Sequence, residues 1–297
     1  MLMFIFYLKG YIMVEFAHSF WSKPLFNNKF SDIKTSLAIT MVDYGLSVEY
    51  IHKHGHKIKL YTDRNGFEIF KYIPYDEIIV FENTITNNYH FAASFKFMAL
   101  NHMDLNTVLI DGDIFLKKSE IFNIINSDKS DLLVSFFEPK TYIDNNREKN
   151  LMMVNNLKQF KFEYPYNTIE YDEYDGWYNT SLMKFSNQEL KDEYIRQYKH
   201  NLKLVDDFNF ENSWPDLIIE QRHLTQLLKS SNYKVNLIAD DFPSQRANEK
   251  CLDIGFTHLG SVKKSHHNQI VQEFYSLNKD LLICLDKHIL NLTNNIQ

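Results

Sequence analysis

The sequence is poor in cysteine, glycine and proline, and it has no long apolar run. Its 297 residues include 2 Cys, 8 Gly and 6 Pro, so the chain is neither a disulfide-rich scaffold nor a series of tight turns. Cys251 and Cys284 lack the spacing of a metal site, which favours a reducing, cytoplasmic setting. The apolar residues 1–8 are too few to span a membrane, and they lack the basic leader and cleavage site of a signal peptide. We therefore expect no membrane span. Met13 could equally be the natural start, so we expect residues 1–12 to be an N-terminal extension.

A basic surface is also missing. The formal net charge is -6 and the pI is about 6.1. Lys and Arg do not alternate with aromatic residues along any stripe, so the sequence predicts no nucleic-acid-binding surface. The chain is 44% hydrophobic and 24% charged, as in globular proteins with a sizeable core. An acidic protein can still bind a single nucleotide, because a metal ion can bridge its carboxylates to the phosphates.

Short apolar runs alternate with longer segments of helical periodicity, which predicts βαβ units and an α/β fold with a largely parallel sheet. We expect Ser31 to cap a long helix whose apolar residues step by three and four as far as Ile51. The polar, tyrosine-rich stretch 140–180 shows no clear element. The predicted strands cover 14–20, 57–61, 77–81, 107–110, 131–137 and 233–239, and the further predicted helices cover 67–72, 90–102, 188–204, 215–229 and the tail from 279. No linker is evident, so we expect a single domain over 13–278 and a C-terminal helix over 279–297.

Two carboxylates follow one of the most apolar of these strands. Asp111 and Asp113, separated by Gly112, come directly after the run 108–110. Ligands bind at this carboxyl edge in open α/β sheets. Adjacent carboxylates repel each other unless a cation or a proton lies between them, and a hard divalent ion would satisfy both while bridging to phosphate oxygens. Gly112 would leave room for a diphosphate. The alternative interpretation is an ordinary Asp-Gly turn without a ligand.

A buried strand that ends in Asp-x-Asp resembles the metal site of glycosyltransferases with the GT-A fold. The resemblance implies a mixed, mostly parallel sheet flanked by helices on both faces. It also implies that Asp111 and Asp113 hold Mn²⁺ or Mg²⁺ against the diphosphate of a nucleotide-sugar donor. No Walker-type loop or Gly-x-Gly-x-x-Gly loop is present to indicate a different nucleotide chemistry.

A second group of residues lies near the C-terminus. His258, Gly260 and Lys263 resemble the His/Gly/Lys signature of glycosyltransferase family 8, the glycogenin and lipopolysaccharide-galactosyltransferase type. The resemblance implies that His258 completes the metal shell and that Gly260 and Lys263 contact the donor diphosphate. An imidazole beside two carboxylates suits Mn²⁺, and Lys263 would offset the charge of the leaving diphosphate. Taken alone, His258 would be an ordinary core or surface histidine.

Four further residues match the family less closely. The segment 176–183 resembles an Asn-containing segment of the family, which implies that Asn179 contacts a sugar hydroxyl. Glu220 and Gln221 resemble an acidic-Gln pair near the transferred sugar. Lys96, on the helix before the Asp-x-Asp strand, takes the place of a basic residue directed at the donor phosphates. Ordinary roles stay open: a backbone partner for the amide of Gln221 and a solvated ammonium for Lys96.

Asp63 and His18, at the ends of early strands, are candidates to bind the base and the ribose. The acidic, aromatic stretch 163–178 would either form a wall for a sugar acceptor, since aromatic rings offer flat amphipathic faces, or be a polar loop.

These residues predict a metal-dependent glycosyltransferase that moves a sugar from a nucleoside diphosphate sugar, with UDP as the expected carrier, to a hydroxyl of a glycan, a lipid-linked sugar or another acceptor. The family 8 resemblance implies retention of the anomeric configuration. Two alternatives stay open. A haloacid-dehalogenase-type phosphatase would use Asp111 as nucleophile and Asp113 as general acid, with Asp240 and Asp241 as further metal ligands. A non-catalytic protein of the same fold would bind a nucleotide sugar without transferring it.

Overall fold

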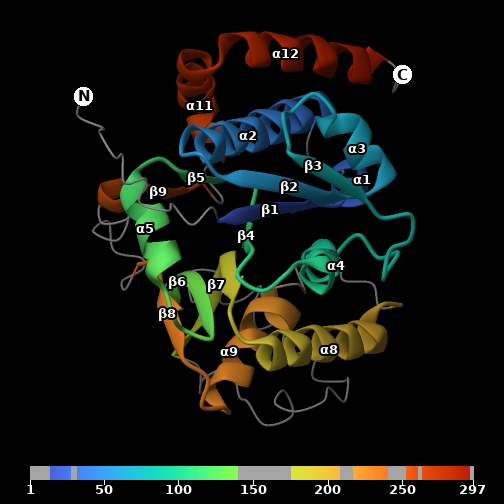
Figure 1. Cartoon of the computed structure of the whole chain (residues 1–297). Coiled ribbons are helices and arrows are strands. Elements are labelled where there is room, and N and C mark those ends of the chain that lie inside the picture. The colour runs from blue at the N-terminus through green and yellow to red at the C-terminus, as the bar shows by residue number, and fades with distance from the viewer. Residues whose placement is uncertain are drawn as a thin grey trace, which may run out of the picture.

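The computed structural model of the chain describes residues 14–27, 32–139, 175–207, 217–239, 252–259 and 263–294. Within these ranges a central sheet carries helices on both faces (Figure 1). The predicted α/β fold, GT-A-like with a mixed, mostly parallel sheet, is confirmed. The predicted N-terminal extension 1–12 lies outside the described residues, and so does most of the stretch 140–180.

Seven strands of the described residues form the main sheet, in the order β3-β2-β1-β4-β7-β6-β8. Strand β7 runs against the other six, which are all parallel to one another. The carboxyl ends of β1, β2, β4 and β6 therefore meet at one edge of the sheet, where ligands bind in folds of this class. The strands are β1 (Glu15–Phe20), β2 (Lys57–Thr62), β3 (Glu77–Val80), β4 (Val108–Ile110), β6 (Leu132–Pro139), β7 (Gly176–Phe185) and β8 (Val235–Leu237).

Helices cover the two faces of the sheet through two separate apolar clusters. One face carries α2 (Ile33–Lys53), α3 (Arg64–Phe70) and α5 (Ser119–Ser127), and α11 (Lys263–Leu277) and α12 (Lys279–Asn294) form an outer layer on α2 (Figure 1). The other face carries α4 (Ser94–His102), α8 (Gln188–Val205), the π-helical segment η4 (Leu217–Arg222) and α9 (His223–Lys229). The short helix α1 (Ser22–Asn27) follows β1.

Helix α2 is long because its first turn is capped and its buried side is well packed. The cap is Asp32, whose carboxylate accepts a hydrogen bond from the Thr35 amide at 2.9 Å. The prediction of Ser31 as the cap was therefore wrong by one residue, since an aspartate caps a helix as well as a serine. At Gly45 a Cβ atom would lie 2.8 Å from the ring of Phe274, so the missing side chain allows α11 to pack closely on α2.

Two three-residue strands form a second, small sheet. Strand β5 (Ile114–Leu116) pairs antiparallel with β9 (Phe256–His258), and Ile114 lies opposite His258. The sequence predicted neither strand, because a run of three residues is too short to show an alternating pattern. Strand β7, part of which falls in the stretch 140–180 that showed no clear element, and the helices α1, α5 and α11 were not predicted either. The pairing matters for the site because it brings the C-terminal His258 beside Asp113.

The pairing of β7 with β6 is irregular, although its pairing with β4 is regular. Val134 pairs with Met183 and Phe136 pairs with Asn179. Between these two pairs β7 advances by four residues while β6 advances by two, so β7 has two extra residues there. Bulges of this kind re-aim side chains and are frequent near functional sites. Here the irregularity delivers Thr180 and Ser181 to the carboxyl end of β4.

The predicted helix 215–229 differs from the observed structure. Its described part begins as the π-helical η4 and becomes α-helical only at His223. The prediction of an α-helix here rested on a 3.6-residue period, which does not hold through a π-helix. The other predicted elements are present with shifted ends; the helix predicted over 90–102, for example, begins at Ser94.

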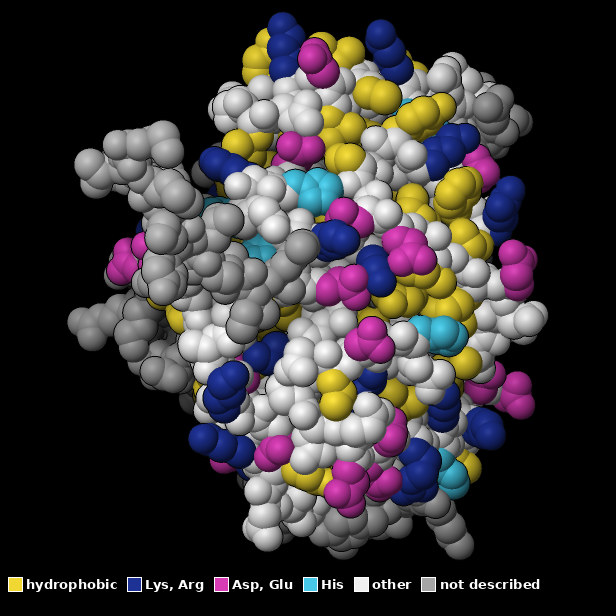
Figure 2. Space-filling view, viewed as in Figure 1, with side chains coloured by type: hydrophobic (Ala, Val, Ile, Leu, Met, Phe, Trp, Pro, Cys, Tyr) yellow, Lys and Arg dark blue, Asp and Glu magenta, His cyan; other side chains and the backbone are white. Residues whose placement is uncertain are grey.

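None of the helices in the described ranges is both long and apolar enough to cross a bilayer. Figure 2 shows Asp and Glu side chains mixed with Lys and Arg on the face that it views. The described residues of that face therefore present no extended field of one sign.

Candidate functional site

Asp111, Asp113 and His258 come together at the carboxyl end of β4. Each offers a ligand atom, and these atoms lie within 4.8 Å of one another. The backbone amide of Asp111 donates to the Ser181 carbonyl at 2.8 Å, and that of Leu259 donates to the Asp113 carbonyl at 3.2 Å. Backbone hydrogen bonds therefore hold the segments that carry the three side chains. His258 Nε2 lies 3.7 Å from Asp113 Oδ2. Two ligands at about 2.1 Å from one Mg²⁺ ion are roughly 3–4 Å apart, so these side chains fit a divalent cation.

Gly112 has a different role from the predicted one. A Cβ atom at this position would lie 2.0 Å from Cε2 of Tyr44 and 2.2 Å from Cδ2 of the same ring. The space that the missing side chain leaves is therefore filled by Tyr44, and it is not open for a diphosphate. The residue is glycine here because an aromatic ring of α2 packs against the Asp-Gly-Asp turn.

Lys96 of α4 connects the Asp-Gly-Asp turn to η4, which lies on the same face of the sheet. Its Nζ lies 2.9 Å from Asp111 Oδ1 and 3.1 Å from Glu220 Oε1, and it also donates to the Thr180 carbonyl at 3.4 Å. Burial alone would lower the pKa of Lys96, but the carboxylates of Asp111 and Glu220 outweigh burial and hold that pKa above its usual value. The ammonium is therefore a permanent charge inside the site, not the solvated side chain of the alternative interpretation.

Glu220 is fully enclosed on η4. Its Oε1 accepts a hydrogen bond from Thr180 Oγ1 at 2.6 Å in addition to the contact with Lys96. Burial raises the pKa of Glu220, and the nearby ammonium of Lys96 offsets only part of this rise. The carboxyl group therefore combines burial with a single strong cationic contact, a combination that is common in functional sites.

Gln221, the next residue, is also buried, with 9% of its surface exposed. Its side-chain oxygen Oε1 is shielded from solvent and accepts no hydrogen bond from the described residues. A buried amide oxygen without a donor costs free energy, so a ligand hydroxyl that reached it would stabilise the protein. The π-helical turn that presents Gln221 is itself a local feature that is often found at functional sites.

Glu138, at the carboxyl end of β6, belongs to the same edge and was missed by the sequence analysis. Trp177 Nε1 donates to its Oε2 at 2.7 Å, and Asn179 Nδ2 donates to its Oε1 at 2.7 Å. Burial raises the pKa of Glu138, while these two hydrogen bonds and then the charge of His258 oppose the rise. The signal that could have revealed it was an acidic residue directly after the predicted strand 131–137.

The side-chain amide of Asn179 makes two hydrogen bonds within the protein. Its Nδ2 is bound to Glu138, its Oδ1 accepts from the Ser181 amide at 2.9 Å, and the residue is 5% exposed. Each polar atom of the Asn179 amide therefore has one protein partner among the described residues, and the predicted contact with a sugar hydroxyl stays a prediction. The side chain also orients Glu138.

His18 and Asp63 have structural roles. His18 is fully buried; its Nδ1 lies 2.8 Å from the Tyr75 hydroxyl and its Nε2 lies 3.1 Å from Ser47 Oγ. Burial lowers the pKa of His18 to about 3, although the charge of Asp113 acts in the opposite direction. Asp63 caps α3 by accepting from the Gly66 amide at 2.9 Å, and it also accepts from Ser22 Oγ at 2.6 Å. Burial closes His18 off from a base or a ribose, whereas Asp63 is only half-buried and its predicted contact stays a prediction.

Several predicted residues lie outside the described part of the chain. Gly260 falls in a gap, and only the backbone of Lys263 is placed, at the start of α11. Asp240 and Asp241, the further carboxylates of the phosphatase alternative, are outside as well, and so are residues 163–174 of the acceptor wall. The contacts predicted for these residues therefore stay predictions.

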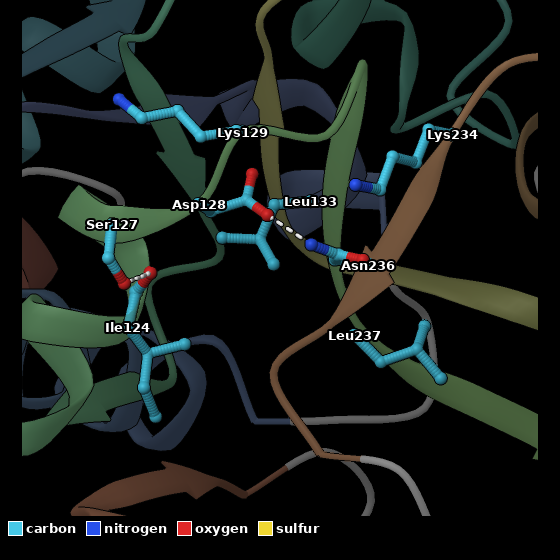
Figure 3. A pocket seen from close by; sticks show the side chains of 8 residues that line it. All are labelled: Ile124, Ser127, Asp128, Lys129, Leu133, Lys234, Asn236 and Leu237. Atoms are coloured by element: carbon cyan, nitrogen blue, oxygen red, sulfur yellow. Dashed lines mark hydrogen bonds between the residues drawn. The ribbon is translucent and has the colours of Figure 1, made fainter.

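A pocket of ≈ 480 Å³ lies away from this cluster, where α5, β6 and the edge strand β8 meet (Figure 3). Its carboxylate, Asp128, is already engaged: Asn236 Nδ2 donates to it at 2.6 Å, and Lys184 Nζ is 3.6 Å from it. The pocket lies at the amino ends of β6 and β8, opposite to the edge that carries Glu138. We therefore place the candidate chemistry at the carboxyl edge.

Comparisons with known proteins identify a family but no activity. The model of a family of unknown function (DUF6734) matches residues 14–274. No curated protein matches the chain. A solved structure, that of HddC from Yersinia pseudotuberculosis, is 14% identical, and the match covers 76% of this chain and 89% of that chain with a TM-score of 0.34. A likeness of that degree carries no inference about function.

Proposed function

This chain belongs to the family of unknown function DUF6734, and we propose from its own side chains that it is a metal-dependent glycosyltransferase. It transfers a sugar from a nucleoside diphosphate sugar, with UDP as the carrier, to a hydroxyl group of a glycan or lipid-linked acceptor. One observation carries the proposal: His258, which is far from the two aspartates in the sequence, comes together with Asp111 and Asp113 at the carboxyl edge of the sheet, with ligand atoms within 4.8 Å of one another.

The donor set supports a hard or borderline divalent ion. Two carboxylates and one imidazole suit Mn²⁺ and also accept Mg²⁺. A bound ion supplies a Lewis acid that neutralises the diphosphate as it leaves the sugar. Asp113 is 4% exposed and His258 is half-buried, so the site has a protected side and a side from which a nucleotide can approach.

The residues around the cluster support a reaction at a sugar carbon. Lys96 fixes the carboxylate of Asp111 on one side and that of Glu220 on the other. Paired with Lys96 in a water-poor environment, the carboxylate of Glu220 would stabilise the positive charge that develops on the sugar ring. The amide oxygen of Gln221, which accepts no hydrogen bond from the part of the chain that the structure describes, is suited to accept one from a sugar hydroxyl.

The remaining details rest on the resemblance to family 8 and on chemistry. Retention of the anomeric configuration is part of the proposal because the resemblance implies it. A reducing, cytoplasmic setting is also part of the proposal, since Cys284 is a free thiol.

A donor-cleavage assay tests the proposed function. The protein is incubated with UDP-glucose, UDP-galactose, UDP-N-acetylglucosamine and the matching GDP sugars, with Mn²⁺ or with EDTA, and released nucleotide is measured. We expect Mn²⁺-dependent release from one donor, reduced at least about tenfold in Asp113→Asn because a metal ligand is lost. Asp104→Asn, which changes an exposed carboxylate, is the matched control and should retain the wild-type rate.

Two results would contradict the proposal and favour one of the alternatives. Hydrolysis of p-nitrophenyl phosphate in the absence of nucleotide, abolished in Asp111→Asn, would assign the chain to the phosphatase alternative. Donor binding without cleavage, unchanged in Asp113→Ala, would assign it a non-catalytic role.

A further inference from the structure

Tyr44 of α2 makes unusually close contact with the Asp-Gly-Asp turn. A Cβ atom at Gly112 would lie 2.0, 2.2 and 2.4 Å from three atoms of its ring, distances that no side chain can accept. Gly112 does not have a positive φ, unlike Gly55, Gly176 and Gly255. The backbone conformation would therefore accept another residue, and the ring of Tyr44 is what excludes one.

The ring is held in place from several directions. Its hydroxyl donates to the Ser19 carbonyl at 3.0 Å, and its centroid lies 4.7 Å from that of Phe70 and 4.9 Å from that of His18. Burial raises the pKa of Tyr44 well above its usual value, and the charges of Asp111 and Asp113 add to this effect. The phenol is therefore a permanent donor that ties the turn to the end of β1.

We propose that Tyr44 is a positioning residue of the metal site, whose ring supports the turn at Gly112 and so sets the separation of the Asp111 and Asp113 carboxylates. The inference rests on the proposed function, because it assumes that these carboxylates bind an ion. Tyr44 itself has no ligand role: its oxygen is used by Ser19. Residues that orient metal ligands without touching the ion commonly change metal affinity by about 10–100-fold.

The positions 44 and 112 are then coupled, and a double-mutant cycle measures the coupling. The variants are Gly112→Ala, Tyr44→Ala and the combination of both, and Tyr44→Phe is the conservative variant that retains the ring. The first measurement is Mn²⁺ affinity by calorimetry. The second is the urea midpoint of unfolding in EDTA, which reports the packing of the two residues without any metal.

We expect Gly112→Ala to weaken Mn²⁺ binding by about tenfold or more, since the new methyl group must displace either the ring or the turn. In the Tyr44→Ala background, Gly112→Ala should lower Mn²⁺ affinity less than about twofold, because the ring no longer fills the space. Tyr44→Phe should retain Mn²⁺ affinity to within about threefold. Gly55→Ala is the control: position 55 has a positive φ and no atom within 4 Å, so it lowers stability by backbone strain and should not change Mn²⁺ affinity.

The inference would be overturned if Gly112→Ala lowered Mn²⁺ affinity equally with Tyr44 and with Ala at position 44. It would also be overturned if Gly112→Ala left Mn²⁺ affinity unchanged in the presence of Tyr44. If Tyr44→Ala does not fold, Tyr44→Leu replaces it in the cycle. Failure of the wild type to bind Mn²⁺ would overturn the proposed function. The unfolding cycle in EDTA would still decide whether the two positions are coupled, so the two failures are distinguishable.

Discussion

Lys96 and Glu220 form an ion pair inside the protein, with Nζ 3.1 Å from Oε1 and side-chain exposures of 14% and 5%. The pair lies beside Asp111, whose Oδ1 is 2.9 Å from the same ammonium. One cation therefore compensates two carboxylates. Removing the ammonium of Lys96 leaves a buried carboxylate beside the proposed metal ligands without a cation. Removing an exposed cation instead leaves carboxylates that water can solvate.

This difference predicts the effect of Lys96→Met on stability. We expect the free energy of unfolding to fall by about 3–5 kcal/mol, the usual cost of breaking a buried ion pair on one side. The matched control is Lys59→Met, which removes a cation paired with Glu15 and Glu77 at the surface and should cost less than about 1 kcal/mol. Urea denaturation at pH 7 measures both. Equal losses in the two variants would show that the Lys96–Glu220 pair is effectively solvated.

Glu138→Gln tests the second carboxylate of the edge. Trp177 Nε1 and Asn179 Nδ2 both donate to Glu138, and an amide offers only one oxygen, so one donor then faces an NH₂ group. We expect a loss of about 1–3 kcal/mol in the free energy of unfolding. Glu82→Gln, at an exposed position, should change stability by less than about 0.5 kcal/mol. A Glu138→Gln protein as stable as the Glu82 control would contradict the hydrogen-bonding scheme.

His18 predicts a specific dependence of stability on pH. Burial lowers its pKa from 6.5 to about 3 in the folded protein, so between these values the unfolded chain binds a proton that the folded chain cannot. The contribution of neutral His18 to the free energy of unfolding is complete above pH 6.5. It is lost as the pH falls toward 3, because only the unfolded chain takes up the proton. From pH 7 to pH 5 the wild type should lose about 2 kcal/mol more than His18→Asn.

Chemical denaturation at several pH values tests this slope. His102→Asn, which changes an exposed histidine and leaves His18 in place, should retain the wild-type dependence. An unchanged slope in His18→Asn would mean that the imidazole is protonated in the folded protein or exchanges with solvent.

The sequence predicted those parts of the site that are encoded locally. The run 108–110 and the two aspartates after it are adjacent in the chain, so the strand and its carboxylates could be inferred together. The alternation of strands and helices predicted the parallel strands of the sheet in the same way, but it did not predict the antiparallel strand β7. His258 was assigned to the cluster from a motif, and the structure places it there through the pairing of β5 with β9.

Contacts between distant segments were beyond the sequence. Nothing local in α2 indicates that Tyr44 packs on Gly112, and nothing local in Lys96 shows that Glu220 is its partner. Asn179 was predicted as a ligand because its amide is polar and lies in a family-like segment, and the sequence did not show that this amide donates a hydrogen bond to Glu138. Histidines near strand ends, such as His18, become core residues when neighbouring helices cover them. Such outcomes depend on tertiary packing, which periodicity and propensity do not report.

The most direct measurement is a calorimetric titration of UDP into the full chain with Mn²⁺ or with EDTA. The titration is repeated for Asp113→Ala, His258→Ala and the control Asp104→Asn. We expect the wild type and the control to bind UDP in Mn²⁺ and to lose that binding in EDTA, and we expect the two ligand variants to bind at least about tenfold more weakly in Mn²⁺. UDP binding that is equally strong in EDTA, or the absence of UDP binding by a folded wild type in Mn²⁺, would contradict the assignment of Asp111, Asp113 and His258 as a metal site for a nucleotide-sugar donor.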